Sequence, residues 1–295
     1  MECDREKRED NGEEMEGGGE NMEKKWEQSL QKRGYQVERL LGKGTTAVVY
    51  LVRDERSGSP FACKTGTVLE WLLPEAELLA DLCHPLFPRF HEYWCTDSYA
   101  FLVMEYVEGR SLQDFLQEGA GMETEEALGM VIQLADGIGV LHNREPMVLY
   151  RDLKPENIML SFDGRVRLID LGGAAVGGGL CMGTPGYAAP EQLRREHEKE
   201  GPATDVYALG RLLERLLVGK RIPRGLRMLL KQCQNQDPGL RIPGTGEWIS
   251  ALLPYYQPEK TGRKRGGKRR KRCFGPVAVL SYRKNIWKSE YKGQE

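Results

Sequence analysis

The segment YRDLKPEN, residues 150–157, constrains this chain more than any other. It is followed by the apolar residues Ile-Met-Leu, and a second strand-like run, RVRLID, ends at Asp170, thirteen residues after Asn157. Asp152, Asn157 and Asp170 thus form a set of hard oxygen ligands that suits a divalent cation and a base for a hydroxyl group. A polar turn with satisfied side chains is the competing interpretation. It leaves unexplained the glycine-rich loop and the strand lysine that precede this segment.

The glycine-rich loop lies in YQVERLLGKGTTAVVYLVRD, residues 35–54. Apolar and polar residues alternate around Gly42 and Gly44, which predicts a strand, a tight loop and a second strand. Two glycines let a backbone approach phosphate groups closely, although such loops are also common as plain turns. Lys64 follows in the apolar strand FACK, where its ammonium group could hold two phosphates.

The spacing of apolar residues divides the rest of the chain into two lobes. Up to Val107 it predicts a small sheet, a helix that begins at Pro74, and a buried strand over residues 101–107. Beyond Gly109, helical spacing recurs over residues 111–119, 124–143 and 204–219, with short strands within 148–160 and 166–170. We therefore expect an α+β fold with a small N-terminal β-sheet lobe carrying one helix, and a larger helical C-terminal lobe.

The two ends of the chain differ from the middle in charge. Residues 1–27 hold eleven acids and five bases, so we expect an acidic, disordered leader over residues 1–34. Residues 254–295 form a basic tail in which Lys260–Arg272 holds nine bases and no acid. No apolar stretch reaches the roughly 20 residues of a membrane helix, and the polar N-terminus is unlike a secretory signal. The seven cysteines, an odd number, suit reduced thiols and a cytoplasmic location.

The ordered motifs resemble the eukaryotic-type serine/threonine protein kinase family over residues 35–253, and they look most like its bacterial members. Besides those above, the motifs are Ala-Pro-Glu at 189–191, TDVYALG at 204–210 and DPGLR at 237–241. The resemblance implies a two-lobed protein kinase-like fold, with an N-lobe over about 35–104 and a C-lobe over about 108–253. It also implies transfer of the γ-phosphate of Mg-ATP to Ser/Thr hydroxyls of protein substrates in signalling. ATP and Mg²⁺ are the implied cofactors.

The resemblance assigns catalytic roles by position. It makes Asp152 the catalytic base and Lys154 the lysine that supports the transferring phosphoryl group. Lys64 contacts the α- and β-phosphates, and Glu75 pairs with it, with Glu77 as an alternative partner. The implied Mg²⁺ ligands are Asn157 and Asp170.

The same resemblance implies nucleotide contacts and structural pairs. Asp205 braces the catalytic loop, and Arg241 pairs with Glu191. The nucleotide contacts are Leu41, Gly42, Lys43, Gly44, Val49, Ala62, Lys64, Glu105, Val107 and Met159.

The segment between Asp170 and Glu191 departs from the family pattern. Its middle, GGAAVGGGLCMG, has no Ser or Thr, and Thr184 is the only hydroxyl residue before Tyr187. Yet Arg151 is present, and in the family an arginine at this position usually receives a phosphate on this segment. The presence of Arg151 predicts a phosphate on this segment, whereas the lack of Ser and Thr in its middle predicts none, and both cannot hold. We expect activity that does not depend on phosphorylation of the segment.

Two other functions remain open: a pseudokinase scaffold and a small-molecule phosphotransferase of related fold. The first should lack a metal ligand or the base, and the second usually lacks Lys154-Pro-Glu and Ala-Pro-Glu. For the basic tail we expect weak, salt-sensitive contact with anionic membrane, so that a cytoplasmic kinase is also peripheral to the membrane. A solvated run, nucleic acid and the acidic leader are the alternatives, and we expect no specific nucleic acid partner.

Overall fold

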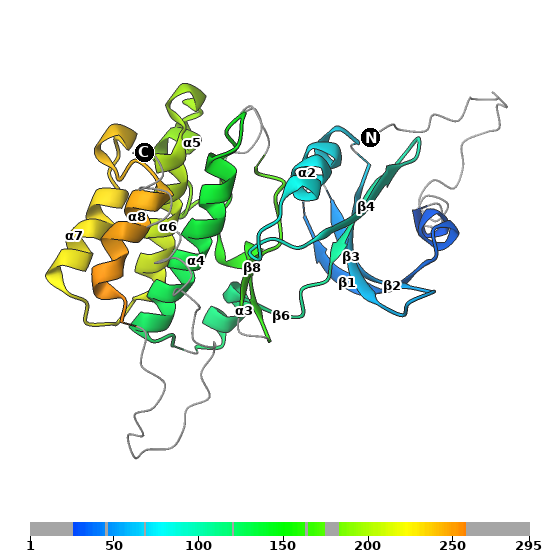
Figure 1. Cartoon of the computed structure of the whole chain (residues 1–295), viewed down its shortest axis with the longest axis horizontal. Coiled ribbons are helices and arrows are strands. Elements are labelled where there is room, and N and C mark those ends of the chain that lie inside the picture. Colours follow the sequence, from blue (N-terminus) through cyan, green and yellow to red (C-terminus); the bar gives the residue numbers. More distant parts are fainter. Residues whose placement is uncertain are drawn as a thin grey trace, which may run out of the picture. The chain divides into compact units, whose positions relative to one another are not determined.

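The computed structural model of the chain describes residues 26–44, 47–67, 69–119, 121–162, 165–174 and 183–257 (Figure 1). These residues form two compact units. Unit 1 falls within Met1–Cys83 and Phe87–Val107, and unit 2 falls within His84–Leu86 and Glu108–Glu295. Unit 1 is built on a sheet and unit 2 is mostly helical, as expected for the α+β fold. None of the helices described is long and apolar enough to cross a membrane.

Unit 1 contains a five-stranded antiparallel sheet. The sequence analysis does not predict β4, because FHEYWC is neither a continuous apolar run nor a regular alternation: His91 and Glu92 stand together between Phe90 and Tyr93. By contrast, β5 is buried along nearly its whole length, as a continuous apolar run predicts. In spatial order the strands are β1 (Tyr35–Lys43), β2 (Val48–Asp54), β3 (Pro60–Gly66), β5 (Ala100–Glu105) and β4 (Phe90–Cys95).

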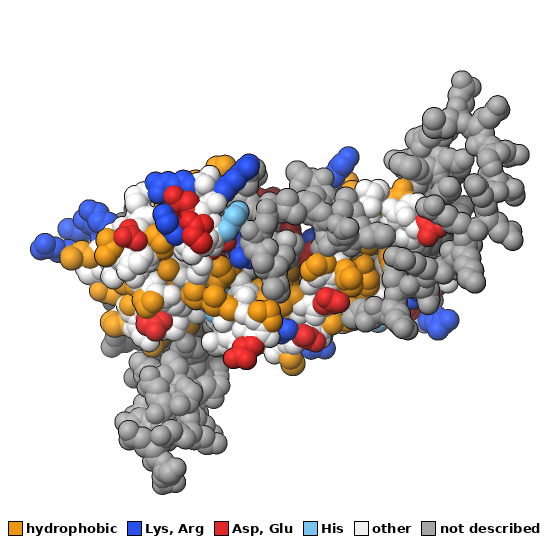
Figure 2. Space-filling view, turned by 90° about the horizontal axis from the view of Figure 1, so that it is seen from above, with side chains coloured by type: hydrophobic (Ala, Val, Ile, Leu, Met, Phe, Trp, Pro, Cys, Tyr) orange, Lys and Arg blue, Asp and Glu red, His pale blue; other side chains and the backbone are white. Residues whose placement is uncertain are grey.

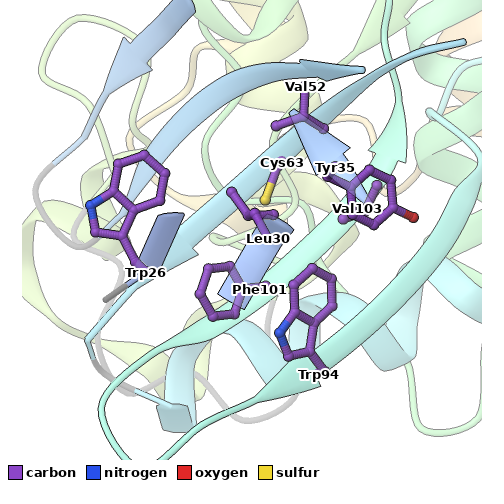
Figure 3. Packing of buried hydrophobic residues seen from close by; sticks show 8 residues of the cluster. All are labelled: Trp26, Leu30, Tyr35, Val52, Cys63, Trp94, Phe101 and Val103. Carbon is purple, nitrogen blue, oxygen red and sulfur yellow. The ribbon is translucent and has the colours of Figure 1, made fainter. Parts of the chain in front are cut away.

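Helical residues 26–32 cover one face of this sheet. Trp26 stacks on Tyr50 with ring centroids 4.5 Å apart, and the Trp94 indole N–H donates to Ser29 Oγ at 3.1 Å. Figure 3 shows the buried cluster that results, whose members are Trp26, Leu30, Tyr35, Val52, Cys63, Trp94, Phe101 and Val103.

The disordered leader expected over residues 1–34 therefore extends too far toward the C-terminus, because residues 26–32 form a helix that packs on the sheet. Trp26 and Leu30 lie one helical turn apart and are 9% and 0% exposed, and burial of both offsets the entropy of ordering this segment. Residues 1–25 of that expected leader lie outside the described residues.

The helix α2 (Leu69–Asp81) begins earlier than the sequence predicts and has Pro74 in its interior. Proline suits a first helical turn, whereas as the sixth residue it removes one main-chain hydrogen bond. Burial explains the earlier start, because Leu72, Ala76 and Leu79 recur on one side of the helix and all three are buried.

Unit 2 contains a small three-stranded sheet, which α3 and α4 contact. The helices α3, α4 and α6 lie where the apolar spacing predicts them, whereas α7 and α8 were not predicted. The three buried residues of α7 recur at helical spacing but stand among charged ones, and Figure 2 shows Lys and Arg side chains on the surface of unit 2. The helices are α3 (Leu112–Gln117), α4 (Thr124–His142), α5 (Pro190–Arg194), α6 (Pro202–Leu216), α7 (Arg224–Cys233) and α8 (Thr245–Leu252). The strands are β6 (Gly109–Ser111), β7 (Ile158–Ser161) and β8 (Val166–Leu168), and the 3₁₀ turns are η1 (Pro155–Asn157), η2 (His197–Lys199), η3 (Pro238–Leu240) and η4 (Leu253–Tyr255).

The central helix of unit 2 is α4, which packs against both α6 and α8. It begins with a capping box, in which the Glu123 N–H donates to Glu126 Oε2 at 3.0 Å. Gly137 allows a close approach, since a Cβ added there would lie 2.2 Å from Leu86 Cδ2. The last residue of α4 is His142, which precedes the loop that carries Asp152.

Four cysteines lie in the described residues. Cys63, Cys83 and Cys233 are free thiols, as expected for reduced cysteines. Cys95 is disulfide-bonded, so that expectation is wrong at this position.

Candidate active site

The loop after α4 is held by Asp205 in the first turn of α6. Asp205 Oδ2 accepts from the Tyr150 N–H and Asp205 Oδ1 from the Arg151 N–H, each at 2.8 Å. His142 Nε2 lies 2.8 Å from Asp205 Oδ2. These bonds hold Arg151 at a φ of 64°, a left-handed conformation that is costly for a side chain of this size. A strained backbone held by a buried carboxylate fixes the direction of the next side chain, Asp152.

The carboxylate of Asp152 accepts three side-chain hydrogen bonds. The Thr184 hydroxyl donates to Oδ1 at 2.8 Å, and Oδ2 accepts from Lys154 Nζ at 2.7 Å and from Asn157 Nδ2 at 3.1 Å. Lys154 Nζ also lies 3.2 Å from Thr184 Oγ1. An aspartate, a lysine and a hydroxyl are thus in mutual contact, which is an arrangement suited to orienting a hydroxyl nucleophile beside a positive charge.

The β7–β8 hairpin brings Asn157 and Asp170 together. Ile158 pairs with Leu168, and the Ile169 N–H donates to the Asn157 carbonyl at 3.1 Å. Asn157 and Asp170 therefore lie at the same end of the hairpin. Asn157 Nδ2 donates to the Asp152 carbonyl at 3.0 Å, which leaves its side-chain oxygen as the group for a cation.

These donors fit a divalent metal ion. Carboxylate and amide oxygens are the ligands that Mg²⁺ takes in proteins, commonly one or two carboxylates together with substrate phosphates. In the part of the chain that the structure describes, no cluster of three or more His, Cys, Asp or Glu side chains could hold a metal. One carboxylate oxygen from Asp170 and one amide oxygen from Asn157 fit a cation that also takes substrate phosphates as ligands.

The buried phenol of Tyr150 stays neutral beside these groups. Burial raises the pKa of Tyr150 well above its ordinary value, and the carboxylates of Asp170 and Asp152 raise it further. Tyr150 is 1% exposed.

In unit 1, Lys64 and Glu75 form an ion pair. Lys64 Nζ donates to Glu75 Oε2 at 2.6 Å, and the two side chains are 12% and 4% exposed. Cys63 points into the apolar cluster, so Lys64 lies on the opposite face of the sheet because side chains alternate along a strand. Glu75 reaches it there from the second turn of α2, not from the first turn as expected, and Glu77 is exposed. The partner of Lys64 is therefore Glu75.

The glycine-rich loop connects β1 and β2. Gly42 pairs with Val49 in the ladder, and the Gly44 N–H donates to the Ala47 carbonyl at 2.8 Å. A Cβ added at Gly42 would meet no atom within 4 Å, so close packing does not require glycine here and the space beside its backbone is open. Lys43 between the two glycines is exposed. Open backbone of this kind fits the close approach of phosphate oxygens.

The other residues expected to contact the nucleotide belong to both units. Met159 is in unit 2, on β7, where it is partly exposed between the buried residues Ile158 and Leu160. The unit 1 residues are Leu41 on β1, Val49 on β2, Ala62 on β3, Glu105 at the end of β5, and Val107 two residues later.

Glu191 and Arg241 form a buried bidentate ion pair. The two guanidinium nitrogens of Arg241 donate to the two carboxylate oxygens of Glu191 at 2.6 and 2.7 Å. Thr204 Oγ1 donates to the same carboxylate at 2.8 Å. Burial raises the pKa of Glu191, but the hydrogen bonds from Arg241 and Thr204 outweigh it and hold the pKa below its ordinary value. This pair joins α5, which follows Thr184, to the loop after η3.

Two residues around the catalytic loop were missed by the sequence analysis. Glu200 Oε2 accepts from Arg151 Nε at 2.7 Å, and His142 contacts Asp205 as described above. Neither residue belongs to a motif. Glu200 is separated from Arg151 by 49 residues and His142 from Asp205 by 63, so only the folded chain reveals these contacts.

Comparison with known proteins supports the same family. The protein kinase domain family matches residues 35–243, which is more than half of the chain. The chain is 31% identical to an Aurora kinase from Eremothecium gossypii, over 78% of this chain and 72% of that protein. It is 36% identical to CBL-interacting protein kinase 16 from Oryza sativa subsp. japonica, over 63% of this chain and 43% of that protein. A bacterial relative, serine/threonine-protein kinase PknG from Mycolicibacterium smegmatis, is 30% identical over 74% of this chain and 32% of that protein.

The chain spans less than half the length of several curated relatives, down to 26% of a serine/threonine-protein kinase from Dictyostelium discoideum. The similarity nevertheless covers the sheet of unit 1 and the catalytic loop of unit 2. The chain therefore belongs to the protein kinase family, whose members use ATP with a divalent metal ion, and within it to the eukaryotic-type serine/threonine kinases found in eukaryotes and bacteria.

Proposed function

We propose that this chain transfers the γ-phosphate of Mg-ATP to Ser/Thr hydroxyls of protein substrates in signalling. The observation that carries the proposal is the contact network of Asp152, Lys154 and Thr184, in which a hydroxyl already lies 2.8 Å from Asp152 Oδ1. A pseudokinase would be expected to lack one of the groups that hold metal or base, and Asp152, Asn157 and Asp170 are all present.

In this mechanism, Asp152 orients the attacking hydroxyl and accepts its proton. Lys154 places a positive charge beside the phosphoryl group that is being transferred, and Lys64, held by Glu75, contacts the other phosphates. Catalysis then consists mainly of positioning and charge stabilisation. Asn157 and Asp170 would hold Mg²⁺, which neutralises phosphate charge when it is bound.

A phosphotransfer assay on a generic Ser/Thr peptide tests this function. We expect Asp152→Asn to lower kcat about 10²- to 10⁴-fold, because the carboxylate is lost while the shape is kept. Lys64→Met should lower kcat/KM strongly, and omission of divalent cation should abolish transfer. Asp97→Asn and Lys231→Met change the same residue types at exposed positions and should behave as wild type. Wild-type transfer by Asp152→Asn, or transfer to small-molecule hydroxyls alone, would contradict the proposal.

We further propose that the protein is cytoplasmic and binds anionic membrane peripherally through its basic tail. Residues 258–295 lie outside the described residues, so the support is the sequence: nine bases in Lys260–Arg272, followed by the apolar run CFGPVAVLSY at 273–282. Each Lys or Arg near an anionic surface contributes about 1 kcal/mol.

Flotation with anionic vesicles tests the tail. The full chain should float with the vesicles at low salt, and a chain ending at Pro258 should not. High salt should release the full chain. Equal flotation of both chains, or binding that only detergent releases, would contradict an electrostatic contact.

A further inference from the structure

Arg151 and Glu200 form a buried ion pair beside the catalytic base. Arg151 Nε donates to Glu200 Oε2 at 2.7 Å, and the two side chains are 10% and 2% exposed. The other oxygen of the carboxylate, Oε1, lies 2.8 Å from His197 Nδ1. Both oxygens of Glu200 are thus engaged within unit 2.

The pair completes a set of anchors on Arg151. Its N–H is held by Asp205 at 2.8 Å, its carbonyl accepts from Gln192 Nε2 at 3.0 Å, and its side chain is held by Glu200. Glu200 and Asp205 are five residues apart, so one segment that leads into α6 holds both the backbone and the side chain. Since Asp152 is the next residue, a movement of Arg151 displaces the base.

A buried guanidinium needs a compensating anion. If the carboxylate of Glu200 were lost, the buried guanidinium would lose the anion that accepts from its Nε, which is costly, and the loop would shift toward water. The sequence supplies no Ser or Thr between Gly172 and Gly183 that could carry a phosphate to this place.

We propose that Glu200 is a positioning residue that supplies the anion for Arg151 from within the fold, so that Asp152 is held in its working geometry without phosphorylation of the chain. This inference rests on the proposed function, because the group that Glu200 positions is the proposed base. It assigns Glu200 a role in kcat rather than in ATP binding.

The test uses the full-length chain and compares Glu200→Ala, Glu200→Gln and Glu198→Ala. We expect Glu200→Ala to lower kcat about 10- to 100-fold with KM for ATP nearly unchanged, because a small displacement of a catalytic group costs rate. Acetate or inorganic phosphate should restore kcat of Glu200→Ala in a saturable way, since the truncated side chain leaves a space beside the guanidinium. Glu200→Gln should be slow but not restored, because its amide fills that space. Glu198→Ala, an exposed acid in the same turn, should match wild type.

A second readout does not depend on activity. Acetate or phosphate, against chloride at equal ionic strength, should raise the melting temperature of Glu200→Ala by about 2 °C or more and leave wild type and Glu198→Ala unchanged. Phosphatase treatment of wild type should leave kcat unchanged.

The inference is wrong if Glu200→Ala keeps kcat within about twofold of wild type, which is less than the displacement of a base should cost. It is also wrong if kcat of Glu200→Ala falls but acetate and phosphate neither restore kcat nor raise the melting temperature. Glu200 would then contribute only to stability. A wild-type protein without transferase activity would contradict the proposed function, and the melting experiment would still decide whether an anion belongs at Arg151.

Discussion

At the scale of single residues, the Glu191–Arg241 pair is a fully buried charge interaction whose loss should be costly. The two side chains are 1% and 0% exposed. Removing one partner of a buried pair leaves an uncompensated charge, so we expect Glu191→Gln to lower the free energy of unfolding by about 3–5 kcal/mol. Adding Arg241→Met should recover part of that loss, as measured by urea denaturation. Purely additive losses would show that the pair is not energetically coupled.

The same pair predicts how stability depends on pH. Because the pKa of Glu191 is lowered in the folded state, its contribution is fully present above the unfolded pKa and is lost as the pH falls through the folded pKa. Wild type should therefore lose more unfolding free energy on acidification from about pH 7 to about pH 3 than the Glu191→Gln/Arg241→Met double variant. Equal acid sensitivity of the two proteins would assign the effect to other carboxylates.

The sequence could predict the residues that carry chemistry because they belong to short motifs with characteristic spacing. Asp152, Asn157 and Asp170 follow from one loop and one hairpin. Glu200 could not be predicted, because nothing in the sequence distinguishes this glutamate from its exposed neighbour Glu198. Its role depends on a turn that folds a distant segment against the catalytic loop.

At the scale of elements, an experiment on α2 can distinguish a helix that begins at Pro74, as the sequence predicts, from one that begins at Leu69, as the structure shows. If Pro74 is inside the helix, Pro74→Ala restores one main-chain hydrogen bond and should raise the free energy of unfolding by about 1–2 kcal/mol, after allowing for the greater freedom of the unfolded chain. If the helix begins at Pro74, no gain is expected. Glu77→Ala, at an exposed site on the same helix, provides the control in urea denaturation.

Elements with clean periodicity could be predicted and mixed ones could not. The helices α4 and α6 repeat apolar residues at helical spacing, and β5 is a continuous apolar run. α7 is an exception, because its buried residues Leu226, Leu230 and Cys233 do recur at helical spacing among charged residues and the sequence analysis did not use that signal, whereas α8 is only eight residues long. Short or highly charged elements depend on tertiary packing for their stability, and local sequence does not show that packing.

At the scale of the whole molecule, the folded chain extends beyond the region of family similarity, which begins at residue 35. A chain that begins at Tyr35 lacks Trp26 and Leu30 and should lose about 3–6 kcal/mol of unfolding free energy, since burial of each such side chain contributes about 1.5–3 kcal/mol. Thermal or urea denaturation of this chain and of the full chain measures the difference.

Loss of the helix at residues 26–32 should also reduce activity. This helix helps to bury Cys63, which is next to Lys64 in β3, so its removal should disturb the position of Lys64. The variant Trp26→Ala provides a milder form of the truncation and should lower stability in the same direction. If the chain beginning at Tyr35 were as stable and as active as the full chain, the helix at residues 26–32 would not contribute to the fold.

The placement of the buried tryptophans gives each unit its own optical reporter. Trp26 and Trp94 stack on aromatic rings in unit 1, and Trp248 is fully buried in unit 2. Stacked and buried indoles differ in emission from indoles in water, so fluorescence follows the two units separately once Trp71 and Trp287 are replaced by phenylalanine. If the units unfold independently, one denaturation curve will contain two emission transitions, and Trp248→Phe will remove one of them.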